Sequence, residues 1–290
     1  MTMFKPLLFA LITFSAVGSF AHQDDARILM RPPTFLFDGN EQGKTLFLTD
    51  FGARLGFGGF LSNAAYHSWQ FGSGVDTALL SFSDAAIWRV SLSLDALADS
   101  NNSIGFRMAQ THYEFFSALE FKVDESVWYA GWRHRCRHAA DSTPSRIIMK
   151  TGPEFGFNGL HHVGGFDLIW HASILPYVFG QNEDLSHQHR LNISTSIQAE
   201  YPLFDGIKLF ASGGLSTFWV TRSDAKDYHL FSSVENSHFH FSPGATLGVS
   251  IKGKIGEFKT YMSYASNLDA GFDDKAKQIH IVALNAGFWF

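Results

Sequence analysis

The sequence predicts an all-β fold, a transmembrane antiparallel up-and-down β-barrel of about 12 strands. Three observations support this prediction. Segments of about ten residues alternate apolar and polar side chains, and Gly, Asn, Asp and Ser separate them. The composition is rich in aromatic residues and glycine and poor in charge. The last segment is apolar on one face and ends in phenylalanine.

The composition fits strands that face lipid on one side and a polar interior on the other. Aromatic residues make up 16% of the chain, and 26 Gly accompany only 8 Pro. Charged residues make up 17%, below the roughly 25% of soluble domains, yet the mean hydropathy is near zero. Apolar residues are therefore dispersed rather than gathered in blocks. A net charge of −5 without a basic tract gives no reason to expect a nucleic-acid partner.

The N-terminus, Met1–Ala21, reads as a secretory signal peptide. Lys5 supplies the positive end, Leu7–Val17 a short apolar run, and Ser19-Phe20-Ala21 a small-residue cleavage site. The apolar run is shorter than the roughly 20 residues that a membrane-spanning helix needs. We therefore expect an exported protein without a helical anchor. Its single cysteine excludes an internal disulfide framework.

The rest of the chain divides into a polar N-terminal segment at 22–44, which leads into the barrel, and one barrel domain at 45–290. A soluble β-sandwich also alternates, because one of its faces meets a core. The number of alternating segments, with aromatic residues near their ends, favours the membrane barrel. The expected strands are Thr45–Phe57, Trp69–Phe82, Ile87–Leu97, Ser103–Phe121, Trp128–His138, Arg146–Phe157, Gly165–Phe179, Arg190–Tyr201, Ile207–Thr221, Phe239–Ile251, Glu257–Ala265 and Ile279–Phe290.

The last of these segments has an apolar face formed by alternate residues from Val282 to Phe290. It resembles the terminal strand of bacterial outer-membrane barrels, whose final aromatic residue is part of the signal read by the barrel-assembly machinery. The resemblance implies that Phe288 and Phe290 form this assembly signal. It also implies the outer membrane of a Gram-negative bacterium as the location, with outer-membrane lipid and the assembly machinery as partners.

The segment Val127–Asp141 carries the residues with the most chemistry. With a period of two, its even positions include Trp128, Trp132, His134, Cys136 and His138, and its odd positions end in Arg133, Arg135 and Arg137. If the tryptophans face lipid, the His-Cys-His row lies on the outer face. The three arginines are then expected to face the interior, or lumen, where charge is tolerated. Arg89, Arg107 and Arg146 are further lumenal candidates, and all six arginines could line a pore or pair with Asp95, Glu114 and Glu120.

His134 and Cys136 are the candidate catalytic residues. A histidine beside a cysteine can take up the thiol proton and generate the thiolate that attacks an ester. The other interpretation is a polar strand end in which Cys136 acts as a small apolar residue. A metal site is not expected, because residues at i, i+2 and i+4 on a flat strand spread too far apart to converge on one ion.

The run His134-Arg135-Cys136-Arg137-His138 resembles the His-x-Ser strand motif of outer-membrane phospholipase A. That enzyme is a twelve-stranded barrel that uses a serine and a histidine on its lipid-facing side, an asparagine on the next strand, and calcium. Here His134 matches the histidine and Cys136 replaces the serine. The stretch 145–149 offers no asparagine, so calcium is implied only under this resemblance and is assigned to no residue.

The same strand also resembles that of an uncharacterised family of bacterial outer-membrane barrels with a His-x-Ser-Ser-His-x-x-Asp-Glu pattern. His134, His138 and Asp141 fit this spacing, while Cys136 and Arg137 replace the two serines. That family has no established activity, so the resemblance implies the fold only.

Two functions therefore stay open. The first is a non-enzymatic outer-membrane barrel without a cofactor, either a small porin-like pore or a structural or surface protein of the envelope. The second is a lipid-acting acyl-ester hydrolase, of phospholipase or lipid A deacylase type, that uses a Cys-His pair. The sequence gives neither the substrate or solute nor the oligomeric state.

Overall fold

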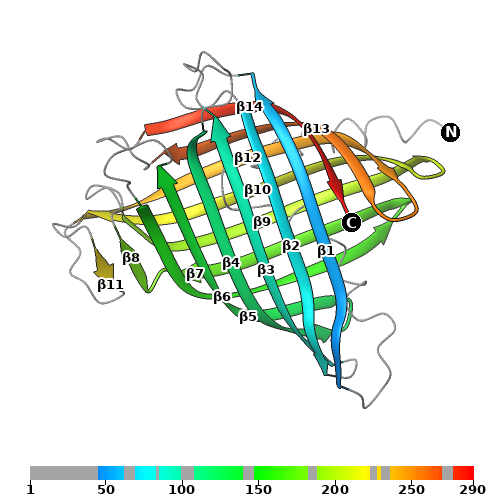
Figure 1. Ribbon diagram of the computed structural model, residues 1–290, viewed down its shortest axis with the longest axis horizontal. Helices are drawn as coiled ribbons and strands as arrows, with labels where there is room; N and C mark the ends of the chain where they lie inside the picture. Colours follow the sequence, from blue (N-terminus) through cyan, green and yellow to red (C-terminus); the bar gives the residue numbers. More distant parts are fainter. Residues whose placement is uncertain are drawn as a thin grey trace.

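The computed structural model describes residues 45–61, 69–82, 85–98, 108–139, 147–181, 188–222, 227–229, 236–269 and 277–290. They form one antiparallel sheet that closes into a barrel (Figure 1). Of its 14 strands, β8 and β11 are short additions, so twelve strands make the ring. The predicted 12-stranded barrel is confirmed. The expected signal peptide and the segment 22–44 lie outside the described residues.

Each strand of the ring pairs with the next along the chain, and β1 and β14 close it. In that closure the main chains of Ala53 and Phe290 exchange two hydrogen bonds, of 2.8 and 3.1 Å. The strands are β1 (Thr45–Phe60), β2 (Trp69–Phe82), β3 (Ala86–Ala98), β4 (Met108–Val123), β5 (Ser126–Ala139), β6 (Ile147–Val163), β7 (Phe166–Pro176), β8 (Phe179–Gln181), β9 (Gln188–Phe204), β10 (Ile207–Arg222), β11 (Tyr228–His229), β12 (Asn236–Lys252), β13 (Glu257–Asp269) and β14 (Lys277–Trp289).

The two ends of the barrel differ in the length of their connections. At one end the turns are 83–85, 124–125, 164–165, 205–206 and 253–256, and the other end has the longer connections 61–68, 99–107, 140–146, 177–187, 223–235 and 270–276. Outer-membrane barrels have short periplasmic turns and longer extracellular loops. We therefore assign the short turns, and the C-terminus beside them, to the periplasmic side.

The tight turns depend on residues that tolerate a positive φ. Gly164 and Gly165 have φ values of 56° and 87°, the pair of signs that a two-residue hairpin turn requires. The corresponding positions Asp124 and Gly206 have φ values of 53° and 73°. These turns set the register of the flanking strands, and so they decide which side chains face inward.

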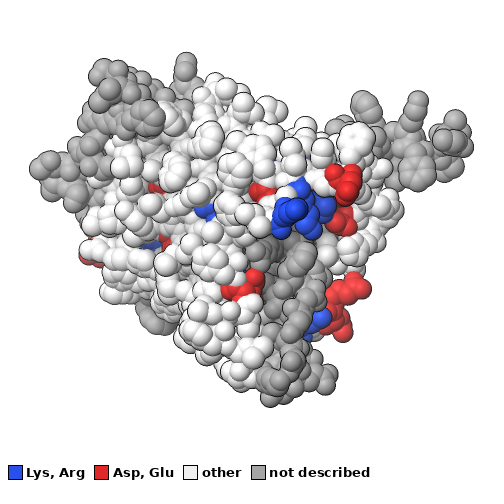
Figure 2. Space-filling model, turned by 45° about the vertical axis from the view of Figure 1, so that its right-hand side comes forward, with Lys and Arg blue, Asp and Glu red and all other residues white. Residues whose placement is uncertain are grey.

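The outer surface of the barrel is apolar. Large apolar side chains are exposed on every strand of the ring, among them Phe51, Leu92, Trp128, Ile197 and Leu284. Figure 2 shows that the visible face carries few charged side chains, gathered in small groups. An apolar exterior over twelve neighbouring strands is what a lipid-facing barrel requires, whereas a soluble barrel would bury these side chains. Among the described residues no helix is long and apolar enough to cross a membrane.

The interior carries the opposite chemistry. Its buried side chains include arginines, glutamates, glutamines and many serines, such as Arg89, Glu120, Gln198 and Ser212. The alternation expected for the segment Ile87–Leu97 holds in β3, where Arg89 is buried and Trp88 exposed. Several strands extend beyond the predicted segments, above all β6, which continues to Val163. Of the expected strand Ser103–Phe121, the part at 103–107 lies outside the described residues.

The closure of the ring yields the first prediction. Deleting Phe290 removes its two main-chain hydrogen bonds to Ala53, and the barrel should lose about 2 kcal/mol at roughly 1 kcal/mol per bond. The matched control is Phe290→Leu, which keeps both bonds. Refolding in detergent, followed by heat-modifiable gel migration, should give less folded barrel for the deletion than for Phe290→Leu. Equal yields would contradict the role of these bonds.

Candidate functional site: the two faces of β5

Strand β5 presents one chemistry to the lumen and another to the lipid. Arg133 and Arg135 are 2% and 6% exposed, whereas Trp128 and Trp132 are 50% and 46% exposed. The structure thus places these arginines inside the barrel, and it places His134, Cys136 and His138 on the outer face, half-buried near the long-connection end. Each face of β5 is a separate candidate site.

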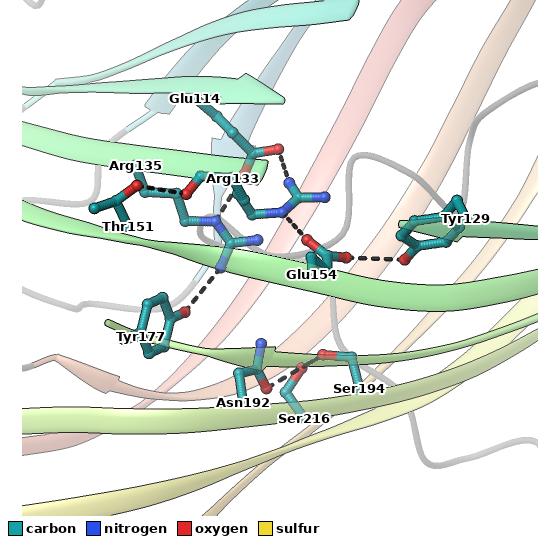
Figure 3. Close-up of polar contacts among 10 residues, drawn as sticks. All are labelled: Glu114, Tyr129, Arg133, Arg135, Thr151, Glu154, Tyr177, Asn192, Ser194 and Ser216. Atoms are coloured by element: carbon teal, nitrogen blue, oxygen red, sulfur yellow. Dashed lines mark hydrogen bonds and ion pairs between the residues drawn. The ribbon is translucent and has the colours of Figure 1, made fainter. Parts of the chain in front are cut away.

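The inner face is organised around Arg133, which lies between two glutamates from neighbouring strands (Figure 3). Its Nε donates to Glu154 of β6 and its Nη1 to Glu114 of β4. Arg135 donates from Nε to the other oxygen of Glu114, at 2.8 Å. One carboxylate therefore bridges two arginines, and the pairs run across three adjacent strands.

Aromatic rings extend this cluster on both sides. The hydroxyl of Tyr129 donates to Glu154 at 2.9 Å, and the Tyr129 ring stacks on His171 at 6.2 Å. Beyond it, His171 Nδ1 lies 2.7 Å from Asn158 Oδ1. The Arg133 guanidinium lies 4.5 Å from the centre of the Phe116 ring. The charged groups are thereby enclosed by rings rather than left in open water.

The cluster extends toward the long-connection end through Tyr177. Arg135 Nη1 donates to the Tyr177 hydroxyl at 3.3 Å, and Lys150 Nζ lies 5.4 Å from the centre of its ring. On β9 and β10, Asn192, Ser194 and Ser216 form a separate polar group in the same part of the barrel (Figure 3). The hydroxyls of Ser194 and Ser216 are 2.9 Å apart.

A second lumenal cluster lies on β2, β3 and β4. Arg89 donates from Nε to Glu120 at 3.0 Å and from Nη1 to Asp76 at 2.5 Å. Glu120 was an expected partner of Arg89, and Asp76 was not. Buried charges are tolerated only when they are paired and hydrogen-bonded. Both clusters meet this condition, and β4 contributes a glutamate to each of them.

On the outer face, the contact to Cys136 comes from His138. The Nε2 atom of His138 lies 3.3 Å from the Cys136 sulfur. The Tyr113 ring, on β4, meets the His138 ring edge-on with centres 5.1 Å apart. His134 is the neighbour of Phe115 and Thr151 in the strand register, and no hydrogen bond joins it to Cys136. In this geometry the histidine in contact with Cys136 is His138, while the catalytic pair His134–Cys136 stays a prediction.

The outer face holds a thiol beside an imidazole, but the described residues supply no carboxylate or amide to orient the imidazole of His138. Its neighbours in the register are Thr111 and Ile147. Asp141, which fits the pattern of the uncharacterised family, lies outside the described residues. Among all the described residues, no group of three or more His, Cys, Asp or Glu side chains is arranged to hold a metal ion.

Sequence reasoning missed Glu154, which completes the cluster around Arg133. The signal was available in the alternation of β6, where Gly152, Glu154 and Gly156 share the inward face. A side chain at position 156 would clash with Tyr129, because a Cβ there would lie only 2.4 Å from the Tyr129 hydroxyl oxygen. Glycine is therefore required at this position. The register that pairs Arg133 with Gly152 and Gly131 with Glu154 brings Glu154 within reach of the guanidinium.

The similarities to known proteins are distant. No protein-family model matches the chain, and no curated protein matches its sequence. Among solved structures, outer membrane phospholipase A from Escherichia coli is 13% identical, with a TM-score of 0.46 over 84% of this chain and 97% of that one. LpxR from Salmonella typhimurium is 8% identical, with a TM-score of 0.46 over 82% and 100%.

A third similar structure is an outer membrane channel from Pseudomonas putida F1, 10% identical, with a TM-score of 0.44 over 93% of this chain and 100% of that one. A channel and a phospholipase therefore resemble this chain to the same degree. At 8–13% identity and TM-scores below 0.5, these similarities do not distinguish a pore from an enzyme. The function depends on the chemistry of the site rather than on the fold.

The inner cluster yields the second prediction. Arg133→Met leaves Glu154 and Glu114 without their shared arginine in a buried setting, and it should lower the free energy of unfolding by about 3–5 kcal/mol. Urea unfolding in lipid vesicles, followed by tryptophan fluorescence, measures the change. The control is Arg222→Gln at the exposed end of β10, expected within about 0.5 kcal/mol of wild type. Similar losses in both variants would contradict the cluster's role.

Proposed function

We propose that this protein is a non-enzymatic outer-membrane barrel whose lumen is closed by paired side chains. It would serve the envelope as a structural or surface protein rather than as an open pore. The observation that carries this proposal is the burial of Arg133 between Glu114 and Glu154. A small-solute pore, the other non-enzymatic interpretation, fits this burial less well.

The burial of these charges bears on whether water fills the lumen. A conducting pore needs a continuous water-filled path, and charged side chains that line such a path are solvated. Here Arg133 and Glu154 are 2% and 3% exposed, so water scarcely reaches them. Arg89 and Glu120 of the second cluster are buried as well. Barrels of few strands have interiors that side chains can fill, and in this one the two ion-pair clusters occupy the lumenal side of β2 to β6.

The third prediction follows from the closed lumen. The purified barrel in planar lipid bilayers should give no steady conductance. The double variant Arg133→Ala/Glu154→Ala removes both partners of one ion pair, so it opens space without leaving either of the two charges unpaired. It should give discrete conductance steps. The control Trp132→Ala alters the outer face of the same strand and should stay silent. Steady conductance in the wild-type protein would overturn the proposal.

A second candidate function is favoured by the contact between Cys136 and His138. In this candidate the protein is an acyl-ester hydrolase that acts on lipid at the outer face. The distance of 3.3 Å from Nε2 to sulfur permits proton transfer. Both residues face outward, on the side where acyl chains lie.

The reaction would proceed in two balanced steps. His138 takes the thiol proton, the Cys136 sulfur attacks the ester carbonyl, and the alcohol leaves with the proton that His138 returns. Water then attacks the thioester with His138 again as base, which releases the fatty acid and restores the thiol. Calcium belongs only to this candidate, through the resemblance to the phospholipase, and the described residues assign it no ligands.

The fourth prediction separates the two functions. Under the hydrolase candidate, Cys136→Ala and His138→Ala abolish fatty-acid release from phospholipid or lipid A vesicles, and Cys136→Ser keeps a fraction of it. His134→Ala is the matched control, since His134 lies on the same face without contacting the sulfur, and it should retain most activity. If folded wild-type protein releases no fatty acid with or without calcium, the hydrolase candidate fails and the closed barrel stands.

A further inference from the structure

The wall formed by β14, β1 and β2, which lie side by side where the ring closes, carries many glycines on its inner face (Figure 1). Phe57 and Phe71 are exposed on the outer surface, so the residues beside them in β1 and β2 face the lumen. Gly287, Gly56 and Gly72 stand directly opposite one another across the three strands. At this level the inner wall has no side chains of its own.

Side chains from neighbouring positions lie over the glycines on either side of Gly56. On the β14 side, the Trp289 ring folds back to 2.8 Å from the position that a Cβ of Gly287 would take. On the β2 side, a carboxylate oxygen of Asp95, from β3, lies 2.5 Å from the corresponding position of Gly72. Gly56 itself differs, because a Cβ there would meet only main-chain atoms among the described residues, the nearest at 3.5 Å.

Arg54 borders Gly56 on the same strand and faces the same way. Its side chain crosses β2, where its Nε lies 2.7 Å from the Cβ position of Gly74. The Asp95 carboxylate and the Tyr261 hydroxyl of β13 both lie within electrostatic range of the guanidinium. We define the Gly56 site as the set Arg54, Gly56, Asp95, Tyr261 and Trp289.

The polar groups of the Gly56 site are only partly satisfied by the described residues. Arg54 Nη2 and Trp289 Nε1 are buried donors without a hydrogen-bond partner in the described chain. Arg54 and Asp95 attract each other, yet within the described ranges no hydrogen bond joins them, whereas Arg89 is bonded to two carboxylates. Buried polar groups without partners are costly, so a ligand that supplies the missing bonds is favoured there.

We propose that the Gly56 site binds a small zwitterion of the α-amino acid class. The carboxylate of the ligand pairs with Arg54, and its ammonium group pairs with Asp95. A simple anion would be repelled by Asp95 and a simple cation by Arg54, so a ligand that carries both charges is complementary to the pair. The indole N–H of Trp289 adds an uncharged donor.

The Gly56 site lies apart from the charge cluster that closes the lumen. It belongs to the wall of β14, β1 and β2 with contributions from β3 and β13, whereas Arg133 and its glutamates lie on β4, β5 and β6. Binding requires access from only one mouth of the barrel, so a lumen that does not conduct is compatible with it. The site therefore stands whether or not the axis conducts.

The fifth prediction concerns glycine binding by the refolded protein in detergent. Equilibrium dialysis with radiolabelled glycine should show saturable binding. Acetate and methylammonium each carry only one of the two charges, and both should compete far more weakly than unlabelled glycine. Arg54→Gln and Asp95→Asn should each weaken glycine binding about tenfold or more, because each removes one charge-assisted hydrogen bond.

The matched pair of variants is Gly56→Ala and Gly59→Ala. A methyl group at Gly56 takes up space at the centre of the site, and the main-chain atoms that it meets lie at ordinary contact distances of 3.5 and 3.9 Å. This variant should therefore fold as wild type and bind glycine about tenfold more weakly or worse. At Gly59, on the outer face of the same strand, a Cβ meets no described atom within 4 Å, and binding should be unchanged. Heat-modifiable migration verifies the fold of each variant.

Four results would overturn the proposal. One is the absence of saturable glycine binding by the folded wild-type protein. Equal binding by Gly56→Ala and Gly59→Ala would place the ligand elsewhere. Competition by acetate as strong as that by glycine would define an anion site, and equally strong competition by glycerol would show that uncharged hydrogen bonding suffices.

Discussion

A strand in lipid has no solvent to satisfy its backbone, so every amide and carbonyl group in the membrane must find its partner within the protein. Closing the sheet into a ring meets this constraint, and the chain does so where β1 pairs with β14. Once the ring is closed, register leaves each side chain either inside or outside. The apolar exterior and the charged interior are two consequences of this one requirement.

The interior then faces a constraint of its own. Charges that are buried inside the barrel must be neutralised there, because water scarcely reaches them. Arg133 with two glutamates and Arg89 with Asp76 and Glu120 achieve this by pairing across adjacent strands. Such pairs tie a side-chain contact to a particular strand register, because a shift by one residue would turn the partners outward. The ion pairs therefore reinforce the register that the hairpin turns set.

The sequence predicts the part of this structure that period-two alternation encodes. All twelve strands of the ring and the division of β5 into two faces follow from it, whereas a register shift of one residue would exchange the face that meets lipid. Strands β8 and β11 do not, since three and two residues are too few to show a period. Glu154 was missed because its role depends on the register between β5 and β6, a relation between segments that no single segment displays. The partner of Cys136 was not predicted because His134 and His138 are both two residues away, and only side-chain conformation distinguishes them.

The two faces of β5 bear on function in opposite ways. The inner arginines are fixed by stability, since the residues that neutralise them lie on β4 and β6 and would be left charged and buried without them. The outer His-Cys-His row is under no such demand, because neither the fold nor any ion pair among the described residues depends on Cys136. A substitution there should cost little stability, so its effect on lipid chemistry can be measured in an intact barrel.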